Sequence, residues 1–289
     1  MKKVILFIIP IILLGILIGV FYNYNKNEKK LEIYSVKTLY SYLANEEKVY
    51  SINVYANKEN SLLNYVTNCE AFICTEDEKI SIEITNSHID SLATYEDSFL
   101  YKYVVSFKLD ITMLQMEDCF LEMVFPKQIY TIYLGDFEIV ENKGLKHFTV
   151  MELAGLSFNE PYLSLAAIEF KYKNDSNNVT INNVYSSNLI SLSFNEDFVN
   201  SDFNKTNIND FFDYHYKNKY DSKAININAN ESLSLFLPIT YKKDIFIANL
   251  FFIIEINGTS YYYENFNYIN TNDLNALKGL IHFGSIENI

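Results

Sequence analysis

Apolar and polar residues alternate in short runs along most of the chain after residue 49. The clearest runs are 80–84, 101–109, 121–125, 166–172, 190–194 and 233–237. A period of two is that of a β-strand with one buried face, and turn-forming residues such as Pro126-Lys127 separate the runs. This pattern predicts a mainly β fold made of antiparallel, Ig-like β-sandwiches.

One hairpin is predicted in detail around Asn257-Gly258. The Asn-Gly pair is preferred in the two-residue type I′ turn, because both central residues of that turn need positive φ. The expected cross-strand pairs are Ile256 with Thr259, Ile254 with Tyr261 and Phe252 with Tyr263. These residues share the more apolar face of the hairpin, as a half-buried antiparallel sheet requires.

The strand runs fall into two groups, which predict two β-sandwich domains over 48–154 and 155–289. Gly155 and the segment Asn159-Glu160-Pro161 mark the boundary, and each part is close to the usual size of a domain. In 31–47 the spacing of apolar residues is closer to that of a helix. We therefore predict a stalk over 23–47.

Ahead of the stalk, 4–22 is predicted to be a transmembrane helix. Only one Pro and two Gly interrupt an apolar run from residue 4 to residue 21, and a run of this length spans a bilayer core. The alternative is a cleaved signal peptide, whose apolar core is shorter and ends at small residues. The run ends in Val20-Phe21-Tyr22-Asn23 instead, so an uncleaved anchor is favoured.

The anchor is expected to make the chain a single-pass protein of the cell membrane, with 1–3 in the cytoplasm and the rest outside. Lysines flank both ends of the run, so their balance does not set the orientation. An apolar run close to an N-terminus usually acts as an export signal, and this favours an extracytoplasmic location.

The chain has 289 residues and a formal net charge of −13, and all 23 basic residues are Lys. A nucleic-acid binder needs a basic surface to neutralise phosphates, so no nucleic-acid partner is expected. Hydrophobic residues make up 49% of the chain, which excludes a largely disordered protein. The Asn-, Ile-, Lys- and Tyr-rich composition suggests an AT-rich bacterial genome.

Three cysteines occur, at Cys69, Cys74 and Cys119. Export permits disulfides, and Cys69 and Cys74 are close enough in sequence for a small-loop bridge if the residues between them turn. The alternative, which we favour, is that all three act as small apolar residues. No spacing of Cys and His resembles a zinc site, so no metal is expected.

The polar segment 198–231 is long for a connection between strands, and such segments often have a function. Within 206–216 apolar residues recur at helical spacing. A crossover helix packed on a sandwich edge is the favoured interpretation. The other is an aromatic contact site for a partner protein or a glycan, with Phe211, Phe212, Tyr214, His215 and Tyr216 as its residues.

No common motif for catalysis or cofactor binding occurs in the chain. The phosphate-binding loops G-x-x-x-x-G-K-[ST] and G-x-G-x-x-G, the metalloprotease motif H-E-x-x-H and the hydrolase motif G-x-S-x-G are absent. We therefore predict no catalytic residue and no cofactor. Paired carboxylates can be far apart in sequence, so an envelope hydrolase with a dispersed site stays as a third hypothesis.

Anchor, β-domains and missing catalytic motifs together favour a non-catalytic binding or assembly module. Its main form is an accessory subunit of a bacterial envelope complex or transporter, with a membrane or envelope protein as partner. The alternative is an adhesin-like surface binder of a glycan or a peptide. Sandwich folds serve many unrelated functions, so the fold alone does not decide between them.

Overall fold

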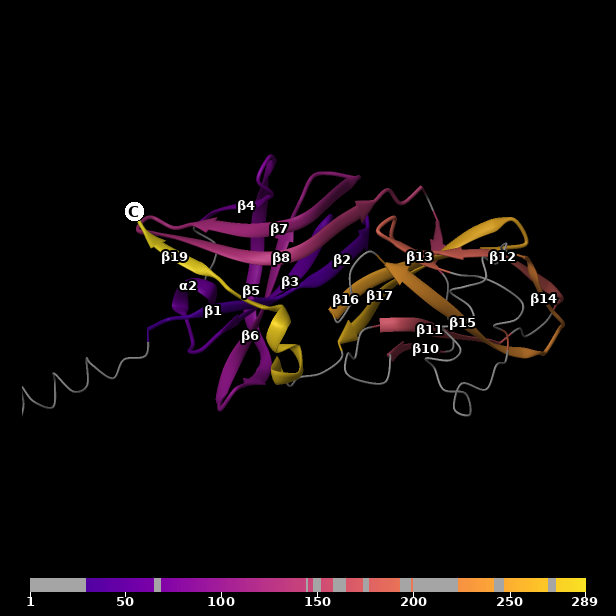
Figure 1. Ribbon diagram of the computed structural model, residues 1–289. Coiled ribbons are helices and arrows are strands. Elements are labelled where there is room, and N and C mark those ends of the chain that lie inside the picture. Colours follow the sequence, from indigo (N-terminus) through magenta and orange to yellow (C-terminus); the bar gives the residue numbers. More distant parts are fainter. Residues whose placement is uncertain are drawn as a thin grey trace, which may run out of the picture. The chain divides into compact units, whose positions relative to one another are not determined.

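The computed structural model describes residues 30–64, 69–143, 145–147, 152–157, 165–173, 177–192, 199, 223–241, 247–269 and 274–289. The fold is mainly β, which confirms the broad class predicted from the alternating pattern (Figure 1). Among the described residues no helix is long and apolar enough to cross a membrane. The predicted anchor at 4–22 lies outside them.

Residues 33–143, here called the first half, form strands and one short helix in their described part, 33–64 and 69–143. The elements are β1 Ile33–Val36, β2 Thr38–Leu43, β3 Val49–Ala56, α2 Ser61–Asn64, β4 Glu70–Cys74, β5 Lys79–Tyr95, β6 Ser98–Lys108, β7 Leu114–Val124 and β8 Gln128–Val140.

Residues 146–269, here called the second half, continue with strands only in their described part. They are β9 Lys146–His147, β10 Glu152–Ser157, β11 Leu165–Lys173, β12 Val179–Tyr185, β13 Ile190–Leu192, β14 Ile225–Ile227, β15 Ser232–Tyr241, β16 Ile247–Ile256 and β17 Thr259–Ile269. A closing segment follows, with the 3₁₀-helix η3 Leu274–Leu280 and strands β18 Ile281–Phe283 and β19 Ser285–Asn288.

Fifteen of the described strands form one large mixed sheet. Its order is β14-β12-β16-β2-β8-β7-β4-β5-β6-β3-β1-β18, with β17 on β16, β9 on β17 and β19 on β8. Most pairs are antiparallel, but β2 pairs in parallel with both β8 and β16. The prediction of purely antiparallel sandwiches is therefore wrong for this sheet, which also continues across the predicted boundary at 154/155.

Strands β1 and β2 lie within the predicted stalk at 23–47. Every residue of β1 is buried, and in β2 only Tyr42 is partly exposed. A strand covered on both faces has no polar alternation, and this explains why its sequence resembled a helix. The compact unit accordingly starts at Ile33 and extends to Ile289.

Strands β18 and β19 return the chain to its first half. β18 pairs with β1 and β19 pairs with β8, both antiparallel. Gly284 lies between them, and its N–H donates to the Ile33 carbonyl at 2.8 Å. A Cβ at Gly284 would lie 3.1 Å from the Thr131 carbonyl oxygen. The segment 281–288 therefore pairs with the first half, although it was assigned to the second predicted domain.

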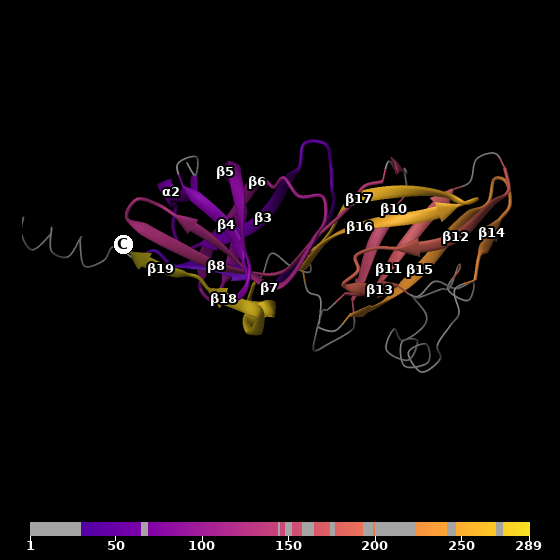
Figure 2. The same ribbon diagram turned by 90° about the horizontal axis from the view of Figure 1, so that it is seen from above.

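In the described part of the second half, a small sheet packs on part of the large sheet. The four-stranded antiparallel sheet β10-β11-β15-β13 packs on strands β12, β14, β16 and β17 of the large sheet (Figure 2). Side chains of both sheets, such as Phe170, Leu235 and Phe252, share one core. The approach is close at Gly155, where a Cβ would lie 2.5 Å from the ring of Tyr268.

The predicted hairpin at Asn257-Gly258 is confirmed. These residues have φ of 50° and 73°, as a type I′ turn requires. The opposite face of β16 is buried as well, because Phe251 and Ile253 pack with Leu43 of β2. The observed pairs include Ile256 with Thr259, Ile254 with Tyr261 and Phe252 with Tyr263.

Gly135 in β8 is expected to tolerate no side chain. It has φ of +104° and lies opposite Cys119 at a β-bulge, and a Cβ there would lie 2.5 Å from the Thr38 carbonyl oxygen. We expect Gly135→Ala to lower the free energy of unfolding by about 2–3 kcal/mol, measured by urea denaturation. Gly258→Ala also has positive φ but meets no atom within 4 Å, so it should cost only about 1 kcal/mol. Equal losses would contradict the steric argument.

Candidate functional site

The candidate site lies where β16 diverges from β2. In its pairing with β17, β16 has a register shift between Leu250 and Phe252, and from Ile253 onwards it pairs with β12. A β-bulge bends its strand, and the ladder between β2 and β16 ends close to this register shift; we call the place where the ladder ends the fork. Their parallel pairing is confined to Leu39 with Ala248 and Tyr40 with Asn249.

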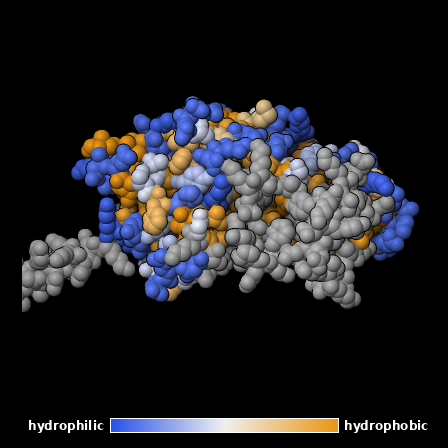
Figure 3. All heavy atoms as spheres, viewed as in Figure 1, coloured by the Kyte–Doolittle hydropathy of each residue, from blue (hydrophilic) through white to orange (hydrophobic). Residues whose placement is uncertain are grey.

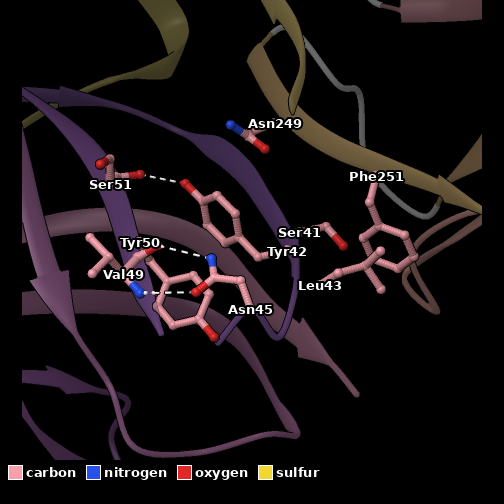
Figure 4. A pocket seen from close by; sticks show the side chains of 9 residues that line it. All are labelled: Ser41, Tyr42, Leu43, Asn45, Val49, Tyr50, Ser51, Asn249 and Phe251. Atoms are coloured by element: carbon pink, nitrogen blue, oxygen red, sulfur yellow. Dashed lines mark hydrogen bonds between the residues drawn. The ribbon is translucent and has the colours of Figure 1, made fainter. Parts of the chain in front are cut away.

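A cavity of about 230 Å³ occupies this fork, and we call it the fork cavity. None of the described residues that line it carries a formal charge, and hydroxyl and amide groups are frequent among them. Strands β2, β3 and β16 supply most of the lining (Figure 4). The residues are Ser41, Tyr42, Leu43, Asn45, Val49, Tyr50, Ser51, Asn249 and Phe251.

Local hydrogen bonds fix the side of the cavity formed by β2 and β3. The Asn45 amide accepts from the Val49 N–H at 3.3 Å and donates to the Val49 carbonyl at 3.4 Å. The Tyr42 hydroxyl donates to the main-chain carbonyl of Ser51 (Figure 4). These bonds hold the connection after β2 against the start of β3, so this wall is formed before a ligand arrives.

A cluster of aromatic rings supports the cavity. The Phe137 ring of β8 lies 5.8 Å from that of Tyr42, 6.4 Å from Tyr50 and 6.0 Å from Phe107, measured between centroids. Burial raises the pKa of Tyr40 to about 12 and that of Tyr42 well above its ordinary value. Both phenols therefore keep their protons at neutral pH and remain hydrogen-bond donors.

Asn249 places a hydrogen-bond acceptor without a donor at the cavity. Its Nδ2 donates to Asn267 Oδ1 at 2.8 Å, whereas its own Oδ1 is buried and accepts no hydrogen bond from any described residue. In Figure 4 the oxygen points toward the labelled residues of the cavity and the nitrogen away from them. A buried acceptor of this kind costs about 1–3 kcal/mol, which a ligand donor would recover.

The buried carboxyl group of Glu138 accepts hydrogen bonds from residues of the second half. Glu138 of β8 is 1% exposed. Its Oε2 accepts from Ser41 Oγ at 2.8 Å and from Ser187 Oγ, and its Oε1 accepts from the Asn188 N–H at 3.1 Å and Nδ2 at 2.8 Å. Buried polar groups are normally satisfied in this way. The turn before β13 is thereby held against β2 and β8.

A second cavity of about 280 Å³ adjoins the first and shares Ser51 and Asn249 with it. Among the described residues that line it, one is charged, Lys102, whose Nζ lies 3.0 Å from a carboxylate oxygen of Asp90. That ion pair also lowers the pKa of Asp90, because the Lys102 ammonium donates to the carboxylate. The cation at this cavity is therefore already paired within the chain.

The surface of the described residues has few exposed large hydrophobic side chains. They are Leu92, Phe99, Met113, Tyr185, Phe283 and Ile289. On the face shown in Figure 3, hydrophobic residues are interspersed among hydrophilic ones. Scattered apolar residues of this kind are normal on soluble surfaces and do not compete with the fork cavity as a site.

The aromatic site predicted at Phe211, Phe212, Tyr214, His215 and Tyr216 lies outside the described residues and stays a prediction. The residues of the fork cavity were not predicted from the sequence. Their one local signal is a polar residue inside an otherwise buried strand, as at Ser41 in β2 and Asn249 in β16. About 200 residues separate these two positions, and no motif links them.

The three cysteines are thiols in the structure, so the bridge considered between Cys69 and Cys74 is not formed there. Cys74 Sγ contacts the Phe120 carbonyl at 3.7 Å. Burial raises the pKa of Cys69 to about 11 and that of Cys119 to about 12, which keeps them protonated and weakly nucleophilic. No group of three or more His, Cys, Asp or Glu within the described ranges could hold a metal ion.

No family model matches the chain, and no curated protein matches it. Among solved structures, it is similar to the C-terminal domain of the Streptococcus agalactiae AgI/II polypeptide BspA. The alignment covers 81% of this chain and 97% of that one, with 10% identity and a TM-score of 0.21. At so low a TM-score, the likeness identifies neither the fold nor the function of this chain.

Proposed function

We propose that this chain is a non-catalytic binding module, held at the outer face of the cell membrane by 4–22, and that its ligand binds in the fork cavity. The observation that carries the proposal is the Oδ1 of Asn249, a buried acceptor to which no described residue donates, in a cavity whose described lining is polar and uncharged. Small ligands are recognised by a few convergent polar groups in a preformed hollow. This cavity offers that arrangement.

The chemistry of the cavity favours a neutral polar ligand, a glycan or a peptide. Its hydroxyl, amide and tyrosine groups make hydrogen bonds and ring contacts without a charge to neutralise. The net charge of −13 also disfavours polyanions. Surface binding is therefore better supported than the accessory-subunit hypothesis, whose contact residues at 206–216 lie outside the described part.

The lining of the cavity also supports binding over catalysis. General acid–base chemistry uses groups such as His, Asp, Glu or Lys placed at the reacting atoms. None of these residue types is among the described residues that line the fork cavity, and the raised pKa of Tyr42 keeps its phenol protonated, so it does not accept a proton. The hydrolase hypothesis therefore requires a site elsewhere in the chain.

The test is a ligand screen with the full chain in detergent micelles. Immobilised neutral and charged glycans form one arm, and displayed random heptapeptides form the other. We expect an uncharged ligand to bind, and Asn249→Ala to weaken binding about tenfold, since one well-formed hydrogen bond is worth roughly 1.4 kcal/mol in affinity.

The matched control is Asn226→Ala. Asn226 is an exposed residue of β14, and it accepts from Thr180 Oγ1 at 2.8 Å. The control should bind as the unchanged chain does. Failure of both arms of the screen, or a ligand whose affinity survives Asn249→Ala, would contradict the proposal.

A further inference from the structure

We propose that the fork cavity and the second cavity are two subsites of one elongated site, and that its ligand is a neutral oligosaccharide of at least two sugar units. This inference rests on the proposed function and names its ligand class. Three features support it: the volumes of the two cavities, the strands that run along both of them, and the polar side chains at their junction.

Each cavity alone is smaller than a usual site for a small ligand. The fork cavity has a volume of about 230 Å³ and the second cavity one of about 280 Å³, whereas such sites usually have about 300–1,000 Å³. Together the two volumes fall within that range. A ligand of ordinary size therefore extends from one cavity into the other, with a compact part in each.

Two strands place side chains along both cavities. In a strand, every second residue lies on the same face, about 6.6 Å further along. On β2, Tyr42 lines the fork cavity and Tyr40 lines the second cavity. On β3, Val49 lines the fork cavity and Asn53 the second, and Ser51 between them lines both. The cavities therefore follow one another along the same faces of β2 and β3.

Tyrosine hydroxyl groups fix the distance between these strands at each cavity. The Tyr42 hydroxyl donates to the Ser51 carbonyl, and the Tyr40 hydroxyl accepts from the Asn53 N–H at 2.9 Å. The centroids of the two rings lie 6.4 Å apart, and the ring planes differ by only 12°. An oligosaccharide is likewise a regular row of rings, so its successive units match successive positions along β2.

The junction of the cavities carries an acceptor that needs a donor. Ser51 and Asn249 line both cavities, and in Figure 4 they lie at the upper end of the fork cavity. The buried Oδ1 of Asn249 accepts no hydrogen bond from any described residue. A ligand that passes this junction supplies the missing donor if it carries a hydroxyl group there.

The side chains favour a sugar over a peptide. Hydroxyl and amide side chains make up most of the described lining of both cavities, and sugar hydroxyl groups both donate to and accept from such groups. The side-chain amide of Asn53 makes no hydrogen bond with a described residue, so it is available to a ligand. Lys102 is paired with Asp90, so an uncharged sugar leaves no charge unbalanced.

The experiment measures the binding of neutral oligosaccharides to the full chain by isothermal titration calorimetry, in a detergent without a sugar head group. The probes are oligomers of glucose, galactose, mannose and N-acetylglucosamine with one to four units. In at least one series we expect the two-unit sugar to bind at least tenfold more tightly than the single sugar, because its second unit occupies the second subsite. Equal affinity of the one- and two-unit sugars in every series that binds, or no binding in any series, would overturn the inference.

Two variants test the junction and the second cavity separately. Asn249→Ala should weaken the two-unit sugar about tenfold. Asn53→Ala should weaken it at least fivefold, change the affinity of the single sugar less than twofold, and leave the unfolding midpoint unchanged. The control Asn226→Ala should bind both sugars as the unchanged chain does. An advantage of two units over one that survives Asn53→Ala in full would overturn the role of the second cavity.

The outcomes also separate this inference from the proposed function. A single sugar or a heptapeptide that binds and loses affinity in Asn249→Ala, without tighter binding of any two-unit sugar, would support the proposed function and overturn the two-subsite site. Absence of both saccharide and peptide binding would overturn both.

Discussion

Replacing Phe137 with Ala is expected to lower the free energy of unfolding by about 3–5 kcal/mol, the usual cost of truncating a buried aromatic residue. The Phe137 side chain is fully buried, and its ring lies within 6.4 Å of Tyr42, Tyr50 and Phe107. Loss of the ring removes this shared contact and leaves a cavity beside the fork. Urea denaturation of the full chain, followed by far-ultraviolet circular dichroism, measures the change.

The matched control is Phe99→Ala. Phe99 is 65% exposed on β6, and surface substitutions usually change stability by about 0.5 kcal/mol or less. A loss at Phe137 no larger than that at Phe99 would contradict the placement of the aromatic cluster in the core.

Replacing Glu138 with Ala is expected to cost about 3 kcal/mol, because it leaves the four donors from Ser41, Ser187 and Asn188 without their acceptor. The loss should be local as well as global. Hydrogen exchange at the Asn188 amide, whose N–H bonds directly to Glu138 Oε1, is expected to accelerate more than exchange in β6.

Two further variants calibrate this result. Glu138→Gln keeps one carbonyl acceptor, and serine hydroxyls can reverse their direction, so its cost should be smaller than that of Ala. Glu141→Ala removes an exposed side chain whose ion pair with Lys143 spans 3.9 Å, and exposed pairs contribute little. A Glu138→Ala variant as stable as Glu141→Ala would show that the carboxyl group does not hold the turn.

Strands with one polar face were predictable from the sequence. β5, β6, β7 and β15 all contain runs found by alternation, and the Asn257-Gly258 turn fixed a register that the structure reproduces pair by pair. In each case the information is local, because the pleat period and the turn geometry are properties of neighbouring residues.

Strands without a polar face were not predictable in the same way. β1 and β2 are covered on both sides. Their apolar composition therefore indicates that they are buried, but it does not indicate which strands they pair with. The partners of β2 are 97 residues away in β8 and 209 residues away in β16. The fork cavity depends on those partners and on the bulge in β16, so no local pattern could reveal it.

The pairing of 281–288 with β1 and β8 also sets an order of events during synthesis. At about 5–20 residues per second, roughly 7–28 s pass between completion of β8 at Val140 and synthesis of Ile281. During that interval the Gln128–Thr131 part of β8 and the outer side of β1 lack the strands that later pair with them. Unpaired strand edges are where chains associate wrongly. The first half is therefore encoded first but completed last, and its exposed edges are natural binding sites for chaperones while the second half is still being made.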